Sequence, residues 1–315
     1  MMQGNKIAVT GIGETAFLRK GEETVMQMMT RASLAAIADA GLTPADIDGY
    51  VSNKYAGHPS EEVAHAIGAG ERRFTAVADT AGGTATTGDA LRLAQLAIEA
   101  GLARHVLVPY AIRSTKPGGV YGFHAREPQK AGLEMPVGFF GQPTYFATMA
   151  NRYAHDHGMS EEELAAVSIT YRAWATLTPS AQRREVMDLD GYRQSPMIST
   201  PLRVADCCLT TDAGCAYVVS AMADARDGPH PVVSVEGVGI GYNNYPHGVL
   251  FSQKPCTYDY PGWESARQAY AMAGVDPKHL DLAQVDRGGA ATARTGGRSA
   301  SAGRAAVRSC RAGRQ

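Results

Sequence analysis

The sequence predicts an α/β protein with a largely parallel sheet. Short apolar runs alternate along the chain with longer segments whose apolar residues recur at helical spacing, which is the order expected when helices connect parallel strands. The composition agrees with this class. A chain of 315 residues with 44% hydrophobic and 19% charged residues can form a core without disulfides or metals.

Strands and helices are expected to alternate through residues 6–110. The expected strands are 6–13, 48–52, 74–78 and 105–110, and the expected helices are 24–40, 61–67 and 85–100. Thr24 is the expected N-cap of the first helix, and Gly41 and Gly101 stand where the first and third helices should end. The third helix is apolar around much of its circumference, so we expect it inside the protein.

The remaining residues predict an irregular segment, two helices and the beginning of a second half. Residues 111–143 are rich in Gly and Pro and are expected to be irregular. The elements expected after them are helices at 144–157, 161–175 and 263–273 and strands at 216–222, 231–241 and 282–285. Ser160 is the expected cap of the helix 161–175. Because strand–helix–strand order restarts after Pro229, we interpret residues 229–285 as the beginning of a second, similar half.

Residues 286–315 differ from the rest of the chain. They contain eight Ala, seven Arg and six Gly, and Val307 is their only large aliphatic residue. Such a segment buries too little apolar area to offset its ordering entropy, so we expect disorder. A natural basic tail and a shifted reading frame are the two explanations, and the abrupt change within an expected strand favours the second.

Cysteine usage and hydropathy indicate a cytoplasmic protein. The five cysteines have no framework spacing, and no run approaches 18 apolar residues, so we expect reduced thiols and no membrane span. The N-terminus has no signal-peptide pattern. The basic tail lacks aromatic residues for base stacking, so no nucleic acid is expected as a partner.

One motif suggests a nucleotide and is set aside. Gly11-x-Gly13-x-x-Ala16 follows a strand and matches a loose dinucleotide fingerprint, which would imply an NAD-dependent oxidoreductase. In that fingerprint the helix begins at the glycines, whereas here it is expected to begin near Thr24. A glycine turn leaving the sheet is the favoured interpretation.

A second glycine-rich stretch is the candidate binding site. Gly82, Gly83 and Thr84 open the long apolar helix, where free backbone N–H groups and the helix dipole suit an oxyanion or a carbonyl. The alternative is a tight strand–helix junction capped by hydroxyls.

Asp206, Cys207, Cys208 and Cys215 could suggest a metal site. Their spacing is not that of paired metal-binding cysteines, and no His lies near them in sequence. Small buried thiols beside a strand are the favoured interpretation, and no metal is expected.

Five stretches resemble the thiolase superfamily, most closely its sterol-carrier-protein-x and lipid-transfer branch, often labelled acetyl-CoA acetyltransferase. They are IAVTGIGETAF, GGTATTGDALRLAQLAIEAGLARHVLV, FATMANRYAHDHGMSEEELAAVSITYRAWATLTPSA, SPMISTPLRVADCCLTTDAGCAYVV and GWESARQAYAMAGVDPKHLDLAQV. The resemblance implies an αβαβα layered sandwich of two halves that dimerises through the first half. The chain would then comprise a first half at 1–228 with an inserted loop region at about 111–200, an incomplete second half at 229–285, and the tail at 286–315.

The same resemblance implies an enzyme that makes or cleaves a carbon–carbon bond beside a CoA thioester. Coenzyme A would be part of the substrate, and no separate cofactor is expected. The family's nucleophilic Cys falls near Gly83 or Thr84, where this chain has none, and its later His and Cys motifs have no counterpart after Val285. Members that lack this Cys include retro-aldolases that act on steroid side-chain acyl-CoAs with a partner subunit of OB-fold type.

These departures leave two interpretations open. The first is an acyltransferase or retro-aldolase that is inactive as the chain stands. The second is a non-catalytic lipid- or acyl-CoA-binding subunit that works with a partner. The resemblance assigns no catalytic residue within this chain, and Gly82, Gly83 and Thr84 are the expected substrate-binding residues. In the segment 211–214, Thr-Asp-Ala-Gly reverses the family's usual Asp-Gly-Ala, which we expect only to shift a turn.

We expect the chain as it stands to associate or aggregate and to show no turnover. An incomplete second half would leave the apolar side of the helix 85–100 and a sheet edge exposed, and such surfaces drive association. Size-exclusion chromatography and thermal unfolding measure this. A soluble, active monomer that melts cooperatively would contradict the expectation.

Overall fold

The computed structural model describes residues 6–53, 58–79, 83–115, 128, 130–242, 257 and 262–284, without the side chains of residues 83–86. The expected tail at 286–315 and the predicted site residue Gly82 lie outside the described residues. The chain divides into two compact units. The first comprises residues 1–115, 211–240 and 267–276, and the second comprises 116–210, 241–266 and 277–315. The halves expected at 1–228 and 229–285 remain a prediction.

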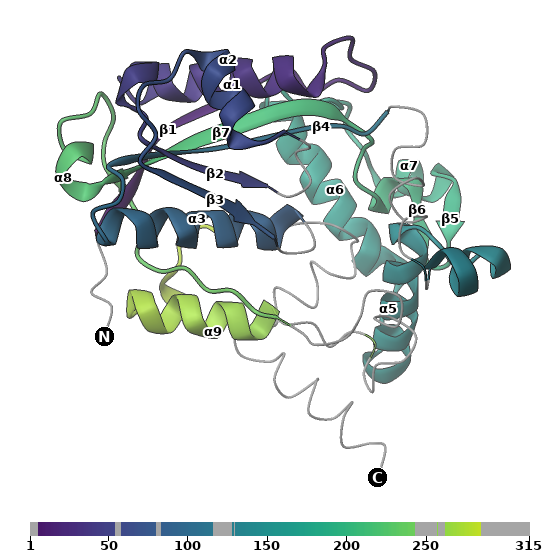
Figure 1. Cartoon of the computed structure of the whole chain (residues 1–315). Coiled ribbons are helices and arrows are strands. Elements are labelled where there is room, and N and C mark those ends of the chain that lie inside the picture. Colours follow the sequence, from purple (N-terminus) through teal and green to yellow (C-terminus); the bar gives the residue numbers. More distant parts are fainter. Residues whose placement is uncertain are drawn as a thin grey trace. The chain divides into compact units, whose positions relative to one another are not determined.

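A six-stranded sheet in the order β3-β2-β4-β7-β1-β8 forms the centre of the first unit (Figure 1). The strands are β1 (Ile7–Glu14), β2 (Gly49–Asn53), β3 (Phe74–Ala78), β4 (His105–Arg113), β7 (Asp212–Ala221) and β8 (Val233–Ser234). β2 is parallel to β3 and β4, whereas β7 is antiparallel to β1 and β4, and β8 is antiparallel to β1. The expected common direction of the first four strands is therefore confirmed. The expected largely parallel sheet is wrong, because β7 enters between β1 and β4.

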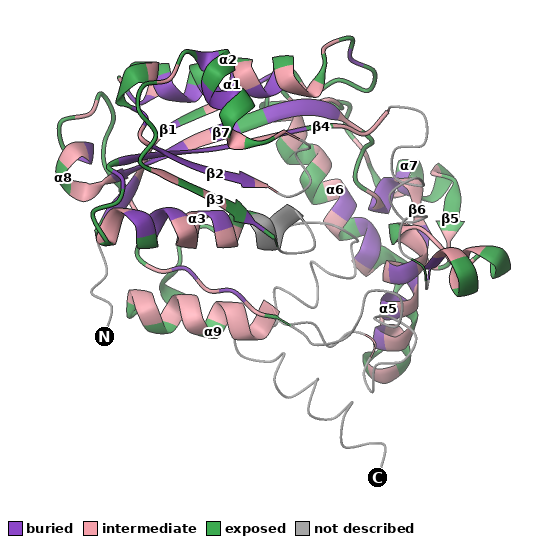
Figure 2. Ribbon diagram, in the orientation of Figure 1, coloured by how far each residue is buried: buried purple, intermediate pink, exposed green. Residues whose placement is uncertain are grey.

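Helices cover both faces of this sheet. α1 (Val25–Asp39) and α2 (Ser60–Ile67) pack on one face, and α3 (Gly83–Glu99) packs on the other. The short α8 (Met222–Ala225) follows β7, and a 3₁₀ turn occupies Pro44–Asp46. Figure 2 shows β2 and β4 largely buried between the helices. The α/β class is confirmed.

The helix ends predicted at Thr24, Gly41 and Gly101 occur in the structure. The Thr24 hydroxyl accepts a hydrogen bond from the Gln27 amide at 3.2 Å, and the Gln27 side chain accepts one from the Thr24 amide at 2.8 Å. Gly41 and Gly101 follow α1 and α3 with φ angles of 70° and 69°, in the left-handed region that glycine adopts without strain. The structure confirms these predicted helix ends. They could be predicted from the sequence because each depends only on residues within one or two helical turns.

Glycines let α1 approach the two central strands closely. A Cβ on Gly11 would lie 2.6 Å from the Ala40 nitrogen, and one on Gly214 would lie 2.6 Å from the Met28 carbonyl oxygen. Gly11 and Gly13 lie within β1, as the expected strand 6–13 predicted, so the separate interpretation of these glycines as a turn that leaves the sheet is wrong. Their small size serves helix–strand packing.

The outer side of α3 is only partly covered. Leu96 is 47% exposed, so the expectation of a fully internal helix is wrong on that side. Residues 235–240 lie along α3, where Arg92 donates a hydrogen bond to the Val238 carbonyl. The Gln268 side chain, on the later turns of α9 (Gly262–Ala273), accepts from the Ile240 amide at 3.2 Å.

Two expected strands in this part of the chain are shorter or absent. Only Val233–Ser234 of the expected strand 231–241 joins the sheet. Side chains of neighbouring helices, rather than a strand, bond the backbone of 238 and 240. Residues 282–284 form no strand, and Val285 lies outside the described residues.

The second unit contains two long helices and a small hairpin. Its elements are α5 (Gln142–His157), α6 (Glu161–Leu177), α7 (Leu189–Gln194), β5 (Met197–Ser199) and β6 (Leu202–Arg203), with single turns at Lys130–Glu134, Met135–Val137, Val204–Asp206 and Pro277–His279. The expected cap is confirmed: the Ser160 hydroxyl accepts from the Glu163 amide at 3.2 Å. Among the described residues, no helix is long and apolar enough to cross a membrane.

Gly11→Ala should lower the free energy of unfolding by about 1–3 kcal/mol, because the added methyl meets α1 backbone that cannot move aside. Urea unfolding measures the change. The matched control is Gly88→Ala in α3, where the nearest atom to the new Cβ is 3.6 Å away. This control should be neutral or stabilising by up to about 1 kcal/mol. Equal effects at the two positions would contradict the packing argument.

Candidate functional site

The predicted binding stretch opens α3. Gly83 and Thr84 form the first turn of the helix, whose own packing fixes it on the sheet. Ala90, Ala94 and Ala97 are each at most 3% exposed and contact the β-strands. A rigid helix therefore presents the N–H groups of its first turn at a defined place.

Tyr217 of β7 contacts α3 at Thr87, one turn after its beginning. Its hydroxyl donates a hydrogen bond to the Thr87 carbonyl at 3.3 Å. Burial, and then the neighbouring Cys215 thiol, raises the pKa of Tyr217 above its usual value, so the phenol stays protonated at neutral pH. Sequence reasoning missed this residue because 130 positions separate it from its partner.

The cysteines are more accessible than the sequence suggested. Cys208 and Cys215 are exposed and Cys207 is half-buried, so the expectation of small buried thiols is wrong. Desolvation by its neighbours, and then the Glu14 carboxylate, raises the pKa of Cys215. Cys215 is thus a neutral thiol at pH 7, unlike an activated nucleophile. No group of three potential metal ligands occurs in the described part of the chain.

Asp212 joins three segments at the beginning of β7. Its carboxylate accepts hydrogen bonds from the Gly21 amide at 3.0 Å, the Thr115 amide at 3.0 Å and the Thr115 hydroxyl. Arg113 lies 4.0 Å away. The reversed Asp-Ala-Gly sequence therefore begins a strand and does not only shift a turn.

A second buried carboxylate organises the second unit. Asp206 is fully buried and accepts hydrogen bonds from the Tyr192 hydroxyl at 2.8 Å, the Ser168 hydroxyl at 3.0 Å and the Arg203 amide at 2.8 Å. Burial, and then the bond to Asp206, raises the pKa of Tyr192. The acidic residue beside the cysteines thus holds α6, α7 and the turn Val204–Asp206 together.

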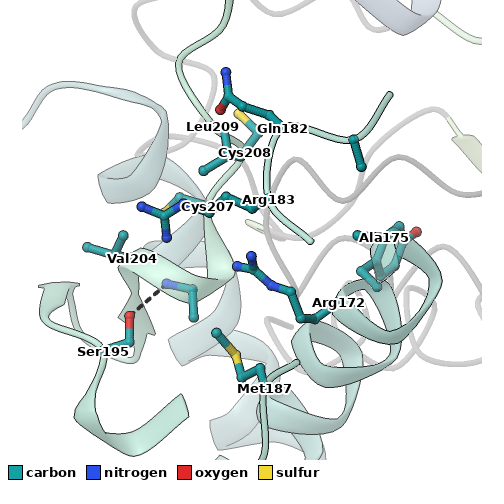
Figure 3. Close-up of a pocket in the computed structure, with 13 residues that line it drawn as sticks. Arg172, Ala175, Gln182, Arg183, Met187, Ser195, Val204, Cys207, Cys208 and Leu209 are labelled. Carbon is teal, nitrogen blue, oxygen red and sulfur yellow. Dashed lines mark hydrogen bonds between the residues drawn. The ribbon is translucent and has the colours of Figure 1, made fainter. Parts of the chain in front are cut away.

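A pocket of about 230 Å³ lies beside this network in the second unit (Figure 3). Its walls come from the end of α6, the segment 181–187 and the turn before β7. The lining residues are Tyr171, Arg172, Ala175, Ala181, Gln182, Arg183, Met187, Ser195, Val204, Ala205, Cys207, Cys208 and Leu209. Figure 3 shows the Arg172 guanidinium directed toward the middle of the labelled residues, and Arg183 also lines the pocket.

The sequence analysis did not predict this pocket. The adjacent Arg183 and Arg184, eleven and twelve residues after Arg172, were the available signal. Arginines at such spacing are normally solvated, and only the folded structure shows which of them line the same pocket.

Comparison with known proteins decides the family. A steroid side-chain-cleaving aldolase from Thermomonospora curvata is 30% identical over 287 residues, which is 88% of this chain and 72% of the aldolase. The chain belongs to the thiolase-like superfamily, in its lipid-transfer branch. No family model matches it.

Two further relatives of this lipid-transfer thiolase-like chain carry related names. A 17-hydroxy-3-oxo-4-pregnene-20-carboxyl-CoA lyase from Mycobacterium tuberculosis is 28% identical and covers 90% of this chain and 75% of its own length. An acetyl-CoA acetyltransferase from Methanothermobacter thermautotrophicus is 27% identical, covering 89% and 73%. These homologues share carbon–carbon bond chemistry at CoA thioesters.

A solved structure supports the same fold. It is described as an Ltp2-ChsH2(DUF35) aldolase, and it matches with a TM-score of 0.84 and 28% identity over 94% of this chain and 77% of that chain.

Asp212→Asn should destabilise the chain by about 2 kcal/mol at pH 7, because a buried acceptor of three hydrogen bonds loses its charge. Burial raises the pKa of Asp212, but the Thr115 and Gly21 hydrogen bonds lower it by more. The folded-state pKa is therefore lower than the unfolded-state pKa of about 4, and the ionised carboxylate stabilises the fold above that pH. This stabilisation is lost as the pH falls through the folded-state pKa.

Urea unfolding at several pH values tests this. The gap between wild type and Asp212→Asn should be full above about pH 5 and should shrink below about pH 4. Asp227→Asn, at an exposed position, is the control and should change stability by less than about 0.5 kcal/mol. A gap that does not vary with pH would contradict the assigned pKa direction.

Proposed function

We propose that this chain serves carbon–carbon bond cleavage of the retro-aldol type beside a CoA thioester. The observation that carries the proposal is that the α3 opening, Gly82-Gly83-Thr84, contains no cysteine. Acyl transfer through a covalent enzyme thioester needs a thiol there, whereas retro-aldol cleavage does not. The aldolase and lyase names of two relatives support this choice over acyl transfer.

The chemistry needs a polarised thioester carbonyl. In a 3-hydroxyacyl-CoA, the hydroxyl loses its proton as the bond between C2 and C3 breaks. The bonding electrons form a thioester enolate, which is protonated at C2, and C3 leaves as a ketone or aldehyde. Charge therefore develops on the thioester oxygen, where oriented N–H donors stabilise it most.

The opening of α3 is the proposed carbonyl-binding element. Gly82, Gly83 and Thr84 are proposed to contact the substrate, with backbone N–H groups and the positive end of the helix dipole directed at the oxygen. The packing of Ala90 and Ala94 supports this role because it holds the helix rigid.

An OB-fold partner subunit is part of the proposal. The solved Ltp2-ChsH2(DUF35) aldolase pairs a similar chain with another protein. We propose a comparable DUF35-type partner here, together with a homodimer of this chain.

The alternative is a subunit that binds acyl-CoA without converting it, and the missing cysteine also favours it. The two functions separate by turnover. A 3-hydroxyacyl-CoA added to a form of the chain with a completed second half, together with its DUF35-type partner, should yield a shortened acyl-CoA and a carbonyl product, detected by mass spectrometry. Binding without product would select the alternative.

Thr84→Trp should weaken acyl-CoA binding by the full chain at least about tenfold, because an indole would occupy the carbonyl position. Isothermal titration with an acyl-CoA measures it. Leu96→Trp is the matched control, since it adds the same side chain to an exposed position on α3 and should leave the affinity unchanged. Unaltered binding by Thr84→Trp would refute the proposed site.

A further inference from the structure

The pocket of the second unit carries an excess of positive charge. Arg172 and Arg183 line it, and none of its lining residues is a carboxylate. The Arg172 side chain is 14% exposed, and its Nη1 lies 3.4 Å from Glu185, whose own side chain is 79% exposed. A pair with one solvated member neutralises a guanidinium weakly.

Arg183 is uncompensated. It has no hydrogen bond or ion pair among the residues that the structure describes, whereas the adjacent Arg184 donates to the Thr176 carbonyl at 3.0 Å. Arg183 lines the pocket and is exposed, so its guanidinium is accessible to a ligand from solution. Two guanidiniums that line one pocket and keep unused N–H donors are suited to one planar or tetrahedral oxyanion.

The pocket is large enough for a small anionic group. Its volume of about 230 Å³ accommodates a phosphate or carboxylate group. Met187, Val204 and Leu209 supply apolar wall beside the guanidiniums.

We propose that this pocket is an oxyanion site for a phosphate monoester or inorganic phosphate, held by Arg172 and Arg183. It belongs to the second unit, whereas α3 belongs to the first, and it does not depend on the proposed lyase activity. The phosphate could be free in solution or belong to coenzyme A, and competition distinguishes these sources.

Inorganic phosphate titrated into the full chain at constant ionic strength, set with chloride, should bind saturably at one site. Arg183→Ala should weaken this binding at least about tenfold, the loss expected for charge-assisted hydrogen bonds. Because Arg183 makes no bond within the described fold, the variant should keep its wild-type circular dichroism and melting temperature. The matched control, Arg184→Ala, should stay within about twofold of wild type.

A second experiment measures the accessibility of Cys208, which lines the pocket. Cys208 is exposed, so phosphate should slow its labelling by neutral iodoacetamide in wild type but not in Arg183→Ala. Displacement of phosphate by coenzyme A but not by dephospho-coenzyme A would identify the 3′-phosphate as the source, and displacement by neither would identify free phosphate. Absence of saturable phosphate binding, or equal affinity in Arg183→Ala, would overturn the proposal.

Discussion

β7 lies between β1 and β4 at the centre of the sheet, and the rest of the first unit depends on that position. The strand follows residues 116–210 in sequence, so its two neighbours come from segments about 100 and 200 residues earlier. Such distant pairings cost loop-closure entropy before they add any stability. β7 follows residues 116–210 in sequence. The first unit therefore needs a strand that comes after most of the second unit to complete its sheet.

Two features stabilise β7 in its central position in the sheet. Asp212 bonds to the loop before α1 and to Thr115 just after β4, so the residues that flank the segment 116–210 are held at one carboxylate. Gly11 and Gly214 remove the side chains that would separate α1 from the paired strands. The carboxylate satisfies backbone donors, and the glycines permit close contact between α1 and the strands.

Acidic and basic side chains are used differently. The acidic residues that a search for active sites would select, Asp206 and Asp212, are buried and bound by backbone and hydroxyl donors of the fold. Two basic residues, Arg172 and Arg183, instead line a pocket that sequence inspection passed over. Buried carboxylates must be satisfied to fold, whereas a partly exposed guanidinium remains hydrated without a partner.

The sequence by itself determined the elements that depend on near neighbours. The α/β order, the Thr24 and Ser160 caps and the glycine stops at 41 and 101 follow from interactions within a few residues. Tertiary structure alone decided the antiparallel place of β7, the short β8, the close contact between Gly11 and α1 and the exposure of the cysteines. Each of these features depends on which segments, far apart in sequence, pack against one another. Local sequence patterns do not indicate such contacts.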